Sequence, residues 1–350
     1  RHNRRGLGTY LATEKCHHIY SEGIKMSNVI FTNAESYAQV HEAFRLDNLN
    51  AMAVEHGLQI YAHIVDGQTY PEYSNVTYGD NDNLTQHFAD FCNVHKPQKI
   101  VNYIDYLTPW DITENIDAEK IWFVRSLYAE VMNKNPEQLE KTSWMLNEKE
   151  GIAAADKVIC ASPTSQEAIK RHYNVDADMV LEYVNPTKFL EVTAPTSFAK
   201  EAYFTGRFDH QKRFDLINEQ TGWNIIGIGG SALDTSEHTN ISSHGYLTFE
   251  EYKDKISQSV FGLYPAVWES NGFGVQECLA MGKVPIIHTG SGGHERLCDN
   301  TNSISIDWTS DNWWEVAESS YNSDMHESAK NTLTVEMYEA SRDKFLDVIL

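Results

Sequence analysis

The sequence predicts an α/β protein built from two Rossmann-like domains that face each other across a cleft. Short runs rich in β-branched and aromatic residues alternate with helical patterns along most of the chain. Such alternation requires parallel sheets that are covered by helices on both faces. The chain also has 350 residues, which is long enough for two domains that each bury a core of their own.

The first domain is expected over residues 26–192. Its strands are predicted at residues 28–32, 58–65, 99–106 and 157–161, and its helices at residues 40–56, 84–94, 118–151 and 162–173. The helix at 40–56 has apolar residues at helical spacing and ends before Gly57. The helix at 162–173 has Pro163 in its first turn. A backbone N–H at that position has no acceptor within the helix, so proline costs no hydrogen bond there.

The second domain is expected over residues 198–334, after a linker around residues 192–197. Its strands are predicted at residues 201–205, 223–228, 243–246, 260–264 and 284–288, and its helices at residues 214–220, 249–257, 274–281 and 313–320. A terminal helix over residues 335–350 is expected to cross back to the first domain.

Residues 1–25 form a basic segment without a clear strand or helix period, and Met26 then leads directly into the first strand. We interpret residues 1–25 as an upstream or non-native extension. The alternative is that Gly6 and Gly8 belong to a glycine loop that follows a strand absent from the chain.

The charge and the cysteines exclude several classes of function. The formal net charge is -22, and both halves of the chain are acidic, which disfavours non-specific binding to nucleic acid or to an anionic membrane. The five cysteines are scattered, without a CxxC pair, so neither a zinc site nor a disulfide framework is indicated. No apolar run approaches the length of about 20 residues that spans a bilayer, and no secretory signal is apparent. We expect a cytoplasmic protein without membrane insertion, metal or cofactor.

The most informative stretch is residues 263–296, LYPAVWESNGFGVQECLAMGKVPIIHTGSGGHER. It predicts a buried strand, a loop with Glu269, a turn bracketed by Gly272 and Gly274, and a helix with Glu277 one turn inside it. The start of that helix should point into the cleft, where its N–H groups and dipole favour a phosphate.

This stretch resembles the Glu-x7-Glu element of the retaining glycosyltransferases with the two-domain GT-B fold. The resemblance implies that Glu269 contacts the donor hexose and that Glu277 binds the ribose. It also implies that the backbone of Gly272, Phe273 and Gly274 faces the sugar and the phosphate.

A second, upstream match covers Gly206, Arg207 and Lys212, which resemble the element whose cations bind the donor diphosphate in that family. Arginine and lysine suit a leaving group that gains negative charge. The segment 225–230, IIGIGG, resembles the strand and loop under the nucleotide base and is weak evidence alone.

The first domain should bind the acceptor, and its match to the family is thinner. Asp105 and His63 are the candidates for a residue that faces the donor sugar, each with the alternative of a structural loop carboxylate or a core histidine. Two Asp-x-Asp sequences, at residues 80–82 and 176–178, lie in turn-like segments and are rejected as metal ligands.

The resemblance implies a metal-independent glycosyltransferase that moves a hexose or pentose from a UDP- or GDP-sugar with retention of configuration. The acceptor is left open between a glycan, a small molecule such as a phosphorylated sugar, and hydroxymethylcytosine in DNA. The alternatives from another class are a nucleotide-sugar epimerase and a non-catalytic sugar-binding protein of the same fold.

Overall fold

The computed structural model describes residues 28–33, 46–63, 73–79, 84–103, 110, 115–134, 142–193, 195, 197–208, 211–217, 222–229, 240–245 and 247–350. The proposed extension at residues 1–25, the candidate Asp105 and the sequence at residues 80–82 lie outside the described residues. Those interpretations therefore stay predictions.

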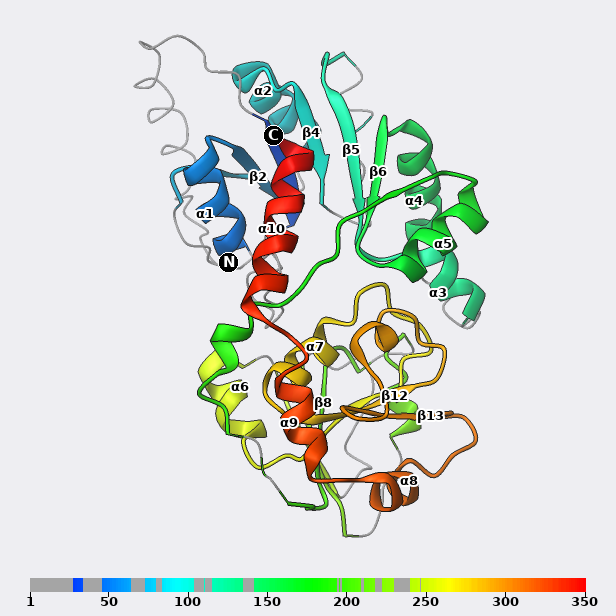
Figure 1. Ribbon diagram of the computed structural model, residues 1–350. Helices are drawn as coiled ribbons and strands as arrows, with labels where there is room; N and C mark the ends of the chain where they lie inside the picture. The colour runs from blue at the N-terminus through cyan, green and yellow to red at the C-terminus, as the bar shows by residue number, and fades with distance from the viewer. Residues whose placement is uncertain are drawn as a thin grey trace, which may run out of the picture.

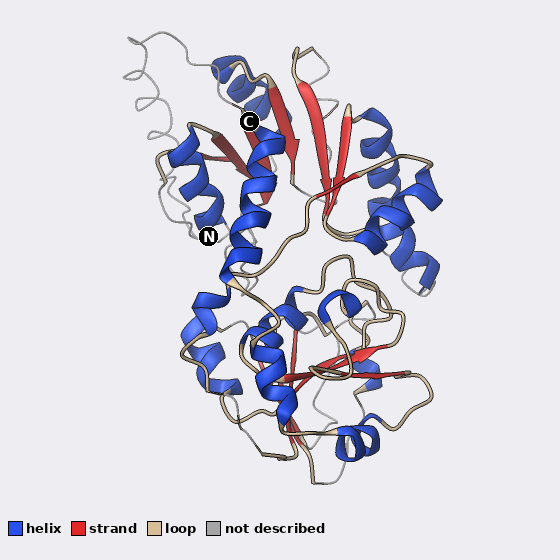
Figure 2. Ribbon diagram, viewed as in Figure 1, coloured by secondary structure: helices blue, strands red, loops and turns tan. Residues whose placement is uncertain are grey.

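A parallel sheet of seven strands, in the order β3-β2-β1-β4-β5-β6-β7, forms what we call the first domain (Figure 1). Its strands are β1 (Val29–Asn33), β2 (Gln59–His63), β3 (Val76–Gly79), β4 (Lys99–Asn102), β5 (Glu119–Val124), β6 (Lys157–Cys160) and β7 (Asp178–Met179). Its helices are α1 (Leu46–His56), α2 (Leu84–His95), α3 (Tyr128–Lys134), α4 (Thr142–Ala154) and α5 (Pro163–Tyr173). Figure 2 shows helices on either side of these strands.

Neighbouring residues on the strands of this sheet belong to different hydrophobic clusters. Ile30 packs in one cluster and Phe31 in the other, and the same alternation separates Val101 from Ile100. Because successive side chains of a strand point to opposite faces, both faces of the sheet are covered. This explains why its strands read as continuous apolar runs.

The helix predicted over residues 118–151 is wrong in its first part. Residues Glu119–Val124 form β5, between β4 and β6, and the separate helices α3 and α4 follow. Residues 121–124 are all buried, because β5 has neighbours on both edges and helices on both faces. A strand in this position has no alternation of polar and apolar residues, and its apolar positions also fit a helical period.

A parallel sheet of six strands, in the order β10-β9-β8-β11-β12-β13, forms the second domain. Its strands are β8 (Glu201–Thr205), β9 (Asn224–Ile228), β10 (Ile241–His244), β11 (Phe261–Tyr264), β12 (Val284–His288) and β13 (Ile304–Ile306). Its helices are α6 (Phe249–Ile256), α7 (Phe273–Ala280), α8 (Trp313–Ser320) and α9 (Asp324–Lys330), with short 3₁₀ turns η5 (Phe214–Leu216) and η6 (Glu295–Leu297).

Besides β5, three strands and one α-helix of the described residues were not predicted from the sequence: β3, β7, β13 and α9. They are short, at two to seven residues, and short elements carry little periodic signal. The helix predicted at residues 214–220 is, in its described part, only the 3₁₀ turn η5.

The terminal helix α10 (Val335–Ile349) returns to the first domain, as predicted (Figure 1). Phe345 and Ile349 are fully buried in the cluster that contains Ile30. Asn28 Nδ2 donates to the carbonyl oxygen of Ile349 at 2.5 Å, and Lys99 Nζ donates to that of Val348 at 3.1 Å. The last helix thus completes one face of the first sheet.

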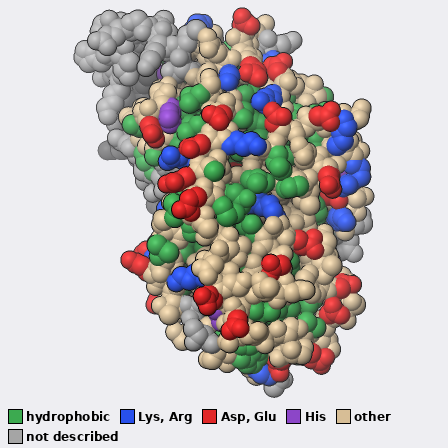
Figure 3. Space-filling view, in the orientation of Figure 1, with side chains coloured by type: hydrophobic (Ala, Val, Ile, Leu, Met, Phe, Trp, Pro, Cys, Tyr) green, Lys and Arg blue, Asp and Glu red, His purple; other side chains and the backbone are tan. Residues whose placement is uncertain are grey.

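The surface is acidic overall but mixed. On the face drawn in Figure 3, the Lys and Arg side chains lie among Asp and Glu side chains. No helix in the described part of the chain combines the length and the apolar composition needed to cross a membrane.

Candidate functional site

A cavity of about 300 Å³ lies between the two domains, lined by residues from both. The first domain contributes Arg125, Ser126 and Tyr128, which follow β5. The second domain contributes the loops that follow β8 and β11 and the start of α7. All the second-domain residues predicted from the sequence line this cavity: Gly206, Arg207, Lys212, Glu269, Gly272, Phe273, Gly274 and Glu277. Ligands of α/β sheets commonly bind at the carboxyl ends of the strands, and this cavity lies at those ends.

Gly272 is the N-cap of α7, directly before its first residue, and has a φ of 73°. A Cβ atom at this position would lie 2.7 Å from Cδ2 of His294 and 3.1 Å from the carbonyl oxygen of Gly293. Both the left-handed backbone and the lack of space therefore require glycine. The consequence is a tight bend that presents the first turn of α7, with its N–H groups and positive dipole end, to the cavity.

Gly274 is fixed by a tyrosine beneath the helix start. The hydroxyl of Tyr264 donates to the carbonyl oxygen of Gly274 at 2.6 Å, and a Cβ atom on Gly274 would lie 2.9 Å from Cε1 of Tyr264. The hydroxyl of Tyr264 also lies 3.2 Å from that of Tyr203. These contacts hold the first turn of α7 close to the end of β11.

Lys212 and Glu269 form an ion pair inside the cavity, with 2.5 Å between Lys212 Nζ and Glu269 Oε1. Burial raises the pKa of Glu269, but the charge and hydrogen bond of Lys212, together with His294 and Arg207, bring that pKa below its ordinary value. Glu269 is therefore ionised at neutral pH. Its backbone is held by the loop before η6, because its N–H donates to Ser291 and its carbonyl oxygen accepts from Gly293.

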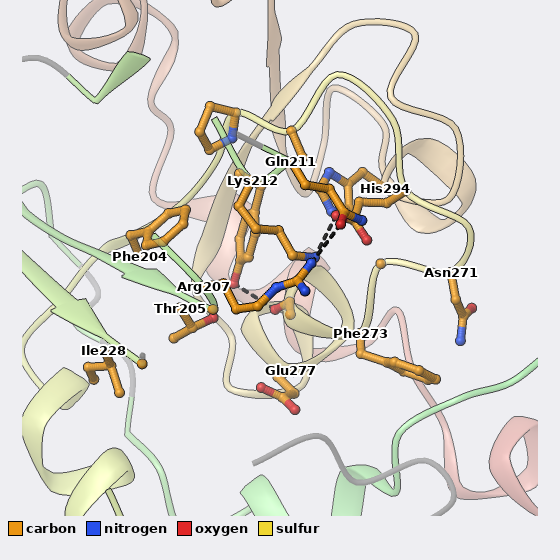
Figure 4. A pocket seen from close by; sticks show the side chains of 18 of the residues that line it. Phe204, Thr205, Arg207, Gln211, Lys212, Ile228, Asn271, Phe273, Glu277 and His294 are labelled. Atoms are coloured by element: carbon orange, nitrogen blue, oxygen red, sulfur yellow. Dashed lines mark hydrogen bonds and ion pairs between the residues drawn. The ribbon is translucent and has the colours of Figure 1, made fainter. Parts of the chain in front are cut away.

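Arg207 lies beside this pair and donates from Nη2 to Oε1 of Gln211 at 2.6 Å. It follows Gly206, whose φ is 126°. The loop after β9 approaches Gly206 closely, since a Cβ atom on Gly229 would lie only 2.1 Å from the Gly206 carbonyl oxygen. In Figure 4, Arg207 lies between His294 on one side and Glu277 on the other. Two cations thus stand next to the start of α7.

Glu277 lies in α7. It is fully buried and lines the same cavity. The spacing of seven residues between the two glutamates therefore places one carboxylate on the loop and the other inside the helix, as the sequence predicted. Both border one ligand-sized space.

His294 lines the cavity and was not predicted from the sequence. Its ring lies 5.6 Å from that of Tyr264, nearly edge-on. Burial lowers the pKa of His294 to about 4, against the opposing effect of Glu269, so the imidazole is neutral at neutral pH. The signal was present in the sequence, as a histidine directly after the glycine pair 292–293, but its burial depends on the fold.

Arg125 is the first-domain cation in the cavity and was also missed. Its guanidinium lies 4.5 Å from the ring centre of Tyr103 and 5.6 Å from that of Phe273, the first residue of α7. Its position follows from β5, which was predicted as part of a helix. Because β5 was predicted as part of a helix, Arg125 could not be placed at the end of a strand beside the cavity.

The candidates of the first domain have a different outcome. His63 is buried at the carboxyl end of β2 and is not among the described residues that line the cavity. Its role, like that of Asp105, stays a prediction.

Of the rejected Asp-x-Asp sequences, Asp176 and Asp178 form ion pairs with Lys170 at 2.8 Å and Lys157 at 2.9 Å. In the described part of the chain, no three His, Cys, Asp or Glu residues are grouped so that they could hold a metal ion.

Comparison with known proteins gives structural matches alone. No family model matches the chain, and no curated protein matches it in sequence. Sucrose-phosphate synthase from Thermosynechococcus elongatus matches with a TM-score of 0.68 and 13% identity, over 90% of this chain and 94% of that protein. HepE from Anabaena, in complex with UDP-glucose, matches with a TM-score of 0.67 and 10% identity, over 91% of this chain and 99% of that protein.

A third match is a lipopolysaccharide outer core galactosyltransferase, WaaB, with a TM-score of 0.64 and 14% identity, over 93% of this chain and all of that protein. At these identities the likeness shows the fold. The predicted class is confirmed: two Rossmann-like domains on parallel sheets of seven and six strands, arranged as in the GT-B proteins.

Proposed function

We propose that this protein is a glycosyltransferase that moves a sugar from a nucleotide-sugar donor to an acceptor hydroxyl with retention of configuration. The observation that carries the proposal is the grouping of two cations, Arg207 and Lys212, with two carboxylates, Glu269 and Glu277, around the start of α7. A nucleotide-sugar has an anionic diphosphate between two groups rich in hydroxyls, and this grouping complements it.

In this proposal the diphosphate lies at the start of α7 between Arg207 and Lys212. The helix dipole, the backbone of residues 272–274 and the two cations stabilise the negative charge that develops as the sugar leaves. Because protein cations provide this stabilisation, we propose a metal-independent transfer. Glu269 accepts hydrogen bonds from the hexose hydroxyls, and Glu277 accepts them from the ribose.

The transfer itself breaks the bond between the anomeric carbon and the diphosphate oxygen and forms one to the acceptor oxygen. We propose that both events occur on the same face of the sugar, with the acceptor proton passing to the departing diphosphate. In this way the anomeric configuration is kept without a carboxylate nucleophile.

Two donor classes, UDP-sugars and GDP-sugars, follow from the sequence resemblance. The UDP-glucose complex of HepE, with its matching fold, supports a UDP-sugar as the first donor to test.

The experiment is a panel of UDP- and GDP-sugars in thermal unfolding of the full chain. A ligand at about one hundred times its Kd adds about 2.7 kcal/mol to the stability of the folded state. We expect one nucleotide series to raise the unfolding midpoint, and the Lys212→Met variant to abolish that increase. A panel in which no nucleotide-sugar raises the midpoint contradicts the proposal.

The stabilising donor is then offered to three acceptor classes: a glycan, a phosphorylated sugar and hydroxymethylated DNA, with products identified by mass. Slow release of free sugar from the donor alone is expected of a transferase. Interconversion of two nucleotide-sugars identifies an epimerase instead, and binding without turnover identifies a sugar-binding protein. The net charge of -22 makes DNA the acceptor that we expect to fail.

A further inference from the structure

Glu182 is a fully buried carboxylate outside the site described above. It lies after β7, on the segment that leads through η4 (Pro186–Phe189) to the second domain. An ionised side chain without water costs several kcal/mol unless it is paired and hydrogen-bonded. Its partners therefore determine what the residue does.

Two of these partners belong to the first domain. The hydroxyl of Tyr103 donates to Oε1 of Glu182, and Nε of Arg125 lies 3.9 Å from Oε2. Tyr103 is itself stacked on Phe123, with 5.1 Å between the ring centres. The carboxylate is thus anchored to the carboxyl ends of β4 and β5.

Further partners belong to the second domain. Nη2 of Arg296, in η6, donates to the carbonyl oxygen of Glu182 at 2.7 Å, and two more partners belong to the loop and helix of the candidate donor site. Nδ2 of Asn271 lies 3.4 Å from Oε2 of Glu182, and Nε2 of Gln276 lies 3.2 Å from its carbonyl oxygen. Gln276 also donates to Oδ1 of Asn271 at 3.2 Å. Asn271 directly precedes the N-cap Gly272, and Gln276 lies in α7. The contacts of these two residues with Glu182 therefore fix the position of the helix start.

A further contact between the domains lies one residue away. The hydroxyls of Ser162 and Ser165, at the start of α5, both donate to the carbonyl oxygen of Ser270. The donor loop, which we define as residues 269–274, is therefore held by the first domain at two successive residues. Of these two attachments, the one at Asn271 uses a charged group.

We propose that Glu182 is a positioning residue that fixes the donor loop against the first domain, so that Arg125 and the start of α7 face the same ligand. The naming of that ligand as a donor rests on the proposed function; the attachment of the loop does not. A carboxylate suits the role because its oxygens only accept, while Tyr103 and Asn271 each present a donor. A glutamine at this position would remove the charge that faces Arg125 and would leave one acceptor oxygen in place of two.

The first test needs no ligand: amide hydrogen exchange of residues 269–277 in the full chain, in Glu182→Gln and in Glu130→Gln. Glu130 is the matched control, because it is also a buried carboxylate, paired with Arg171 and His172 within the first domain. We expect exchange in residues 269–277 to rise about tenfold or more in Glu182→Gln, as for a lost hydrogen bond to a charged group. Unchanged exchange, or an equal rise in Glu130→Gln, overturns the proposal.

The second test exchanges the hydrogen-bond donor and acceptor between residues 182 and 271. Asn271→Asp places a second carboxylate beside Glu182, and Glu182→Gln in the same chain restores one donor and one acceptor. We expect each single variant to raise exchange in residues 269–277 and the double variant to return it to within about threefold of the wild type. If the increases in exchange of the two single variants add up in the double variant, the pairing of Glu182 with Asn271 is contradicted.

Steady-state kinetics of the same variants distinguishes the proposed function from the proposed role of Glu182. If the chain is a glycosyltransferase, Glu182→Gln should raise the donor KM more than it lowers kcat, and the double variant should recover KM. If no nucleotide-sugar binds the wild type, the proposed function fails, while the exchange results still decide the role of Glu182.

Discussion

Nζ of Lys212 lies 2.5 Å from Oε1 of Glu269, although 57 positions separate the two residues in the sequence. Each neutralises the other in the cavity between the domains. A diphosphate that binds here has to compete with Glu269 for the ammonium group. In the proposed function, binding of the diphosphate and release of the Glu269 carboxylate are therefore linked through one ion pair.

Replacement of Lys212 by methionine removes this ammonium group and keeps most of the side-chain volume. We expect turnover to fall by about 100-fold or more, the range found when one stabilising group for a developing anion is removed. Arg213→Met is the control, because this neighbouring cation pairs with Asp215 and is not among the described residues of the cavity. Steady-state kinetics with the stabilising donor measures both. Equal losses in the two variants contradict the assignment.

The same variant should change how stability depends on pH. The pKa of Glu269 is held below its ordinary value, mainly by Lys212 acting against burial. A depressed pKa contributes stability above the ordinary value, and this contribution is lost as pH falls through the depressed pKa. Without Lys212, burial should raise that pKa above its ordinary value, so the carboxyl group of Glu269 should destabilise Lys212→Met at neutral pH, and the stability gap between the variant and the wild type should narrow as pH falls. Thermal unfolding from about pH 7 to about pH 4 measures the shift; parallel curves for the two proteins would contradict it.

The two carboxylates should differ in the kinetic constant that they control. Glu269→Ala is expected to lower kcat severely, since in the proposed function this carboxylate contacts the sugar that reacts. Glu277→Ala is expected mainly to raise the donor KM, since in the proposed function Glu277 contacts the ribose. Full rates in both variants at low donor concentration would remove both residues from the site.

Glu277 also provides a test of orientation. Wild-type protein should bind UDP about 10-fold or more tightly than 2′-deoxy-UDP, because a hydrogen bond to a charged group is worth about 1.5–3 kcal/mol. Glu277→Ala should bind both equally. Calorimetric titration measures the two ratios. A variant that keeps the preference shows that Glu277 does not bind the 2′ hydroxyl.

Gly272→Ala tests the bend at the start of α7 against a control with the same backbone strain. Gly57 has a φ of 70°, close to the 73° of Gly272, but a Cβ atom there meets nothing within 4 Å. Both alanine variants should lose about 1–2 kcal/mol of stability from the left-handed backbone. Gly272→Ala should in addition lose donor binding, because its Cβ atom displaces His294. Binding retained by Gly272→Ala would contradict the assigned geometry.

Several elements of the second domain were predictable because glycines and turn residues separate them in the sequence, although β13 and α9 were missed. The strands predicted at residues 201–205 and 284–288 are observed with the same bounds as β8 and β12. The glycines 272 and 274 mark the start of α7 within one residue. Here the residues that form the turn are also residues that line the cavity, so the motif predicted the candidate site.

The first domain was less predictable because its central strands are buried on both faces. β5 has no alternation of polar and apolar residues, so Trp122 and Val124 fitted a helical period as well as a strand. Arg125 could not be assigned to the cavity once that strand was read as a helix. His294 was missed for a different reason, since a loop histidine acquires its burial only when the loop before η6 packs against Gly272.

The return of α10 to the first sheet has a consequence for biosynthesis. A ribosome releases the residues of β1 to β7 long before Phe345, Leu346 and Ile349, which close one hydrophobic face of that sheet. The half of the molecule that emerges first is therefore finished last, after the whole second half has been translated. A nascent chain arrested between the two sheets should expose that apolar face, and a separately supplied C-terminal half should be able to cover it in trans.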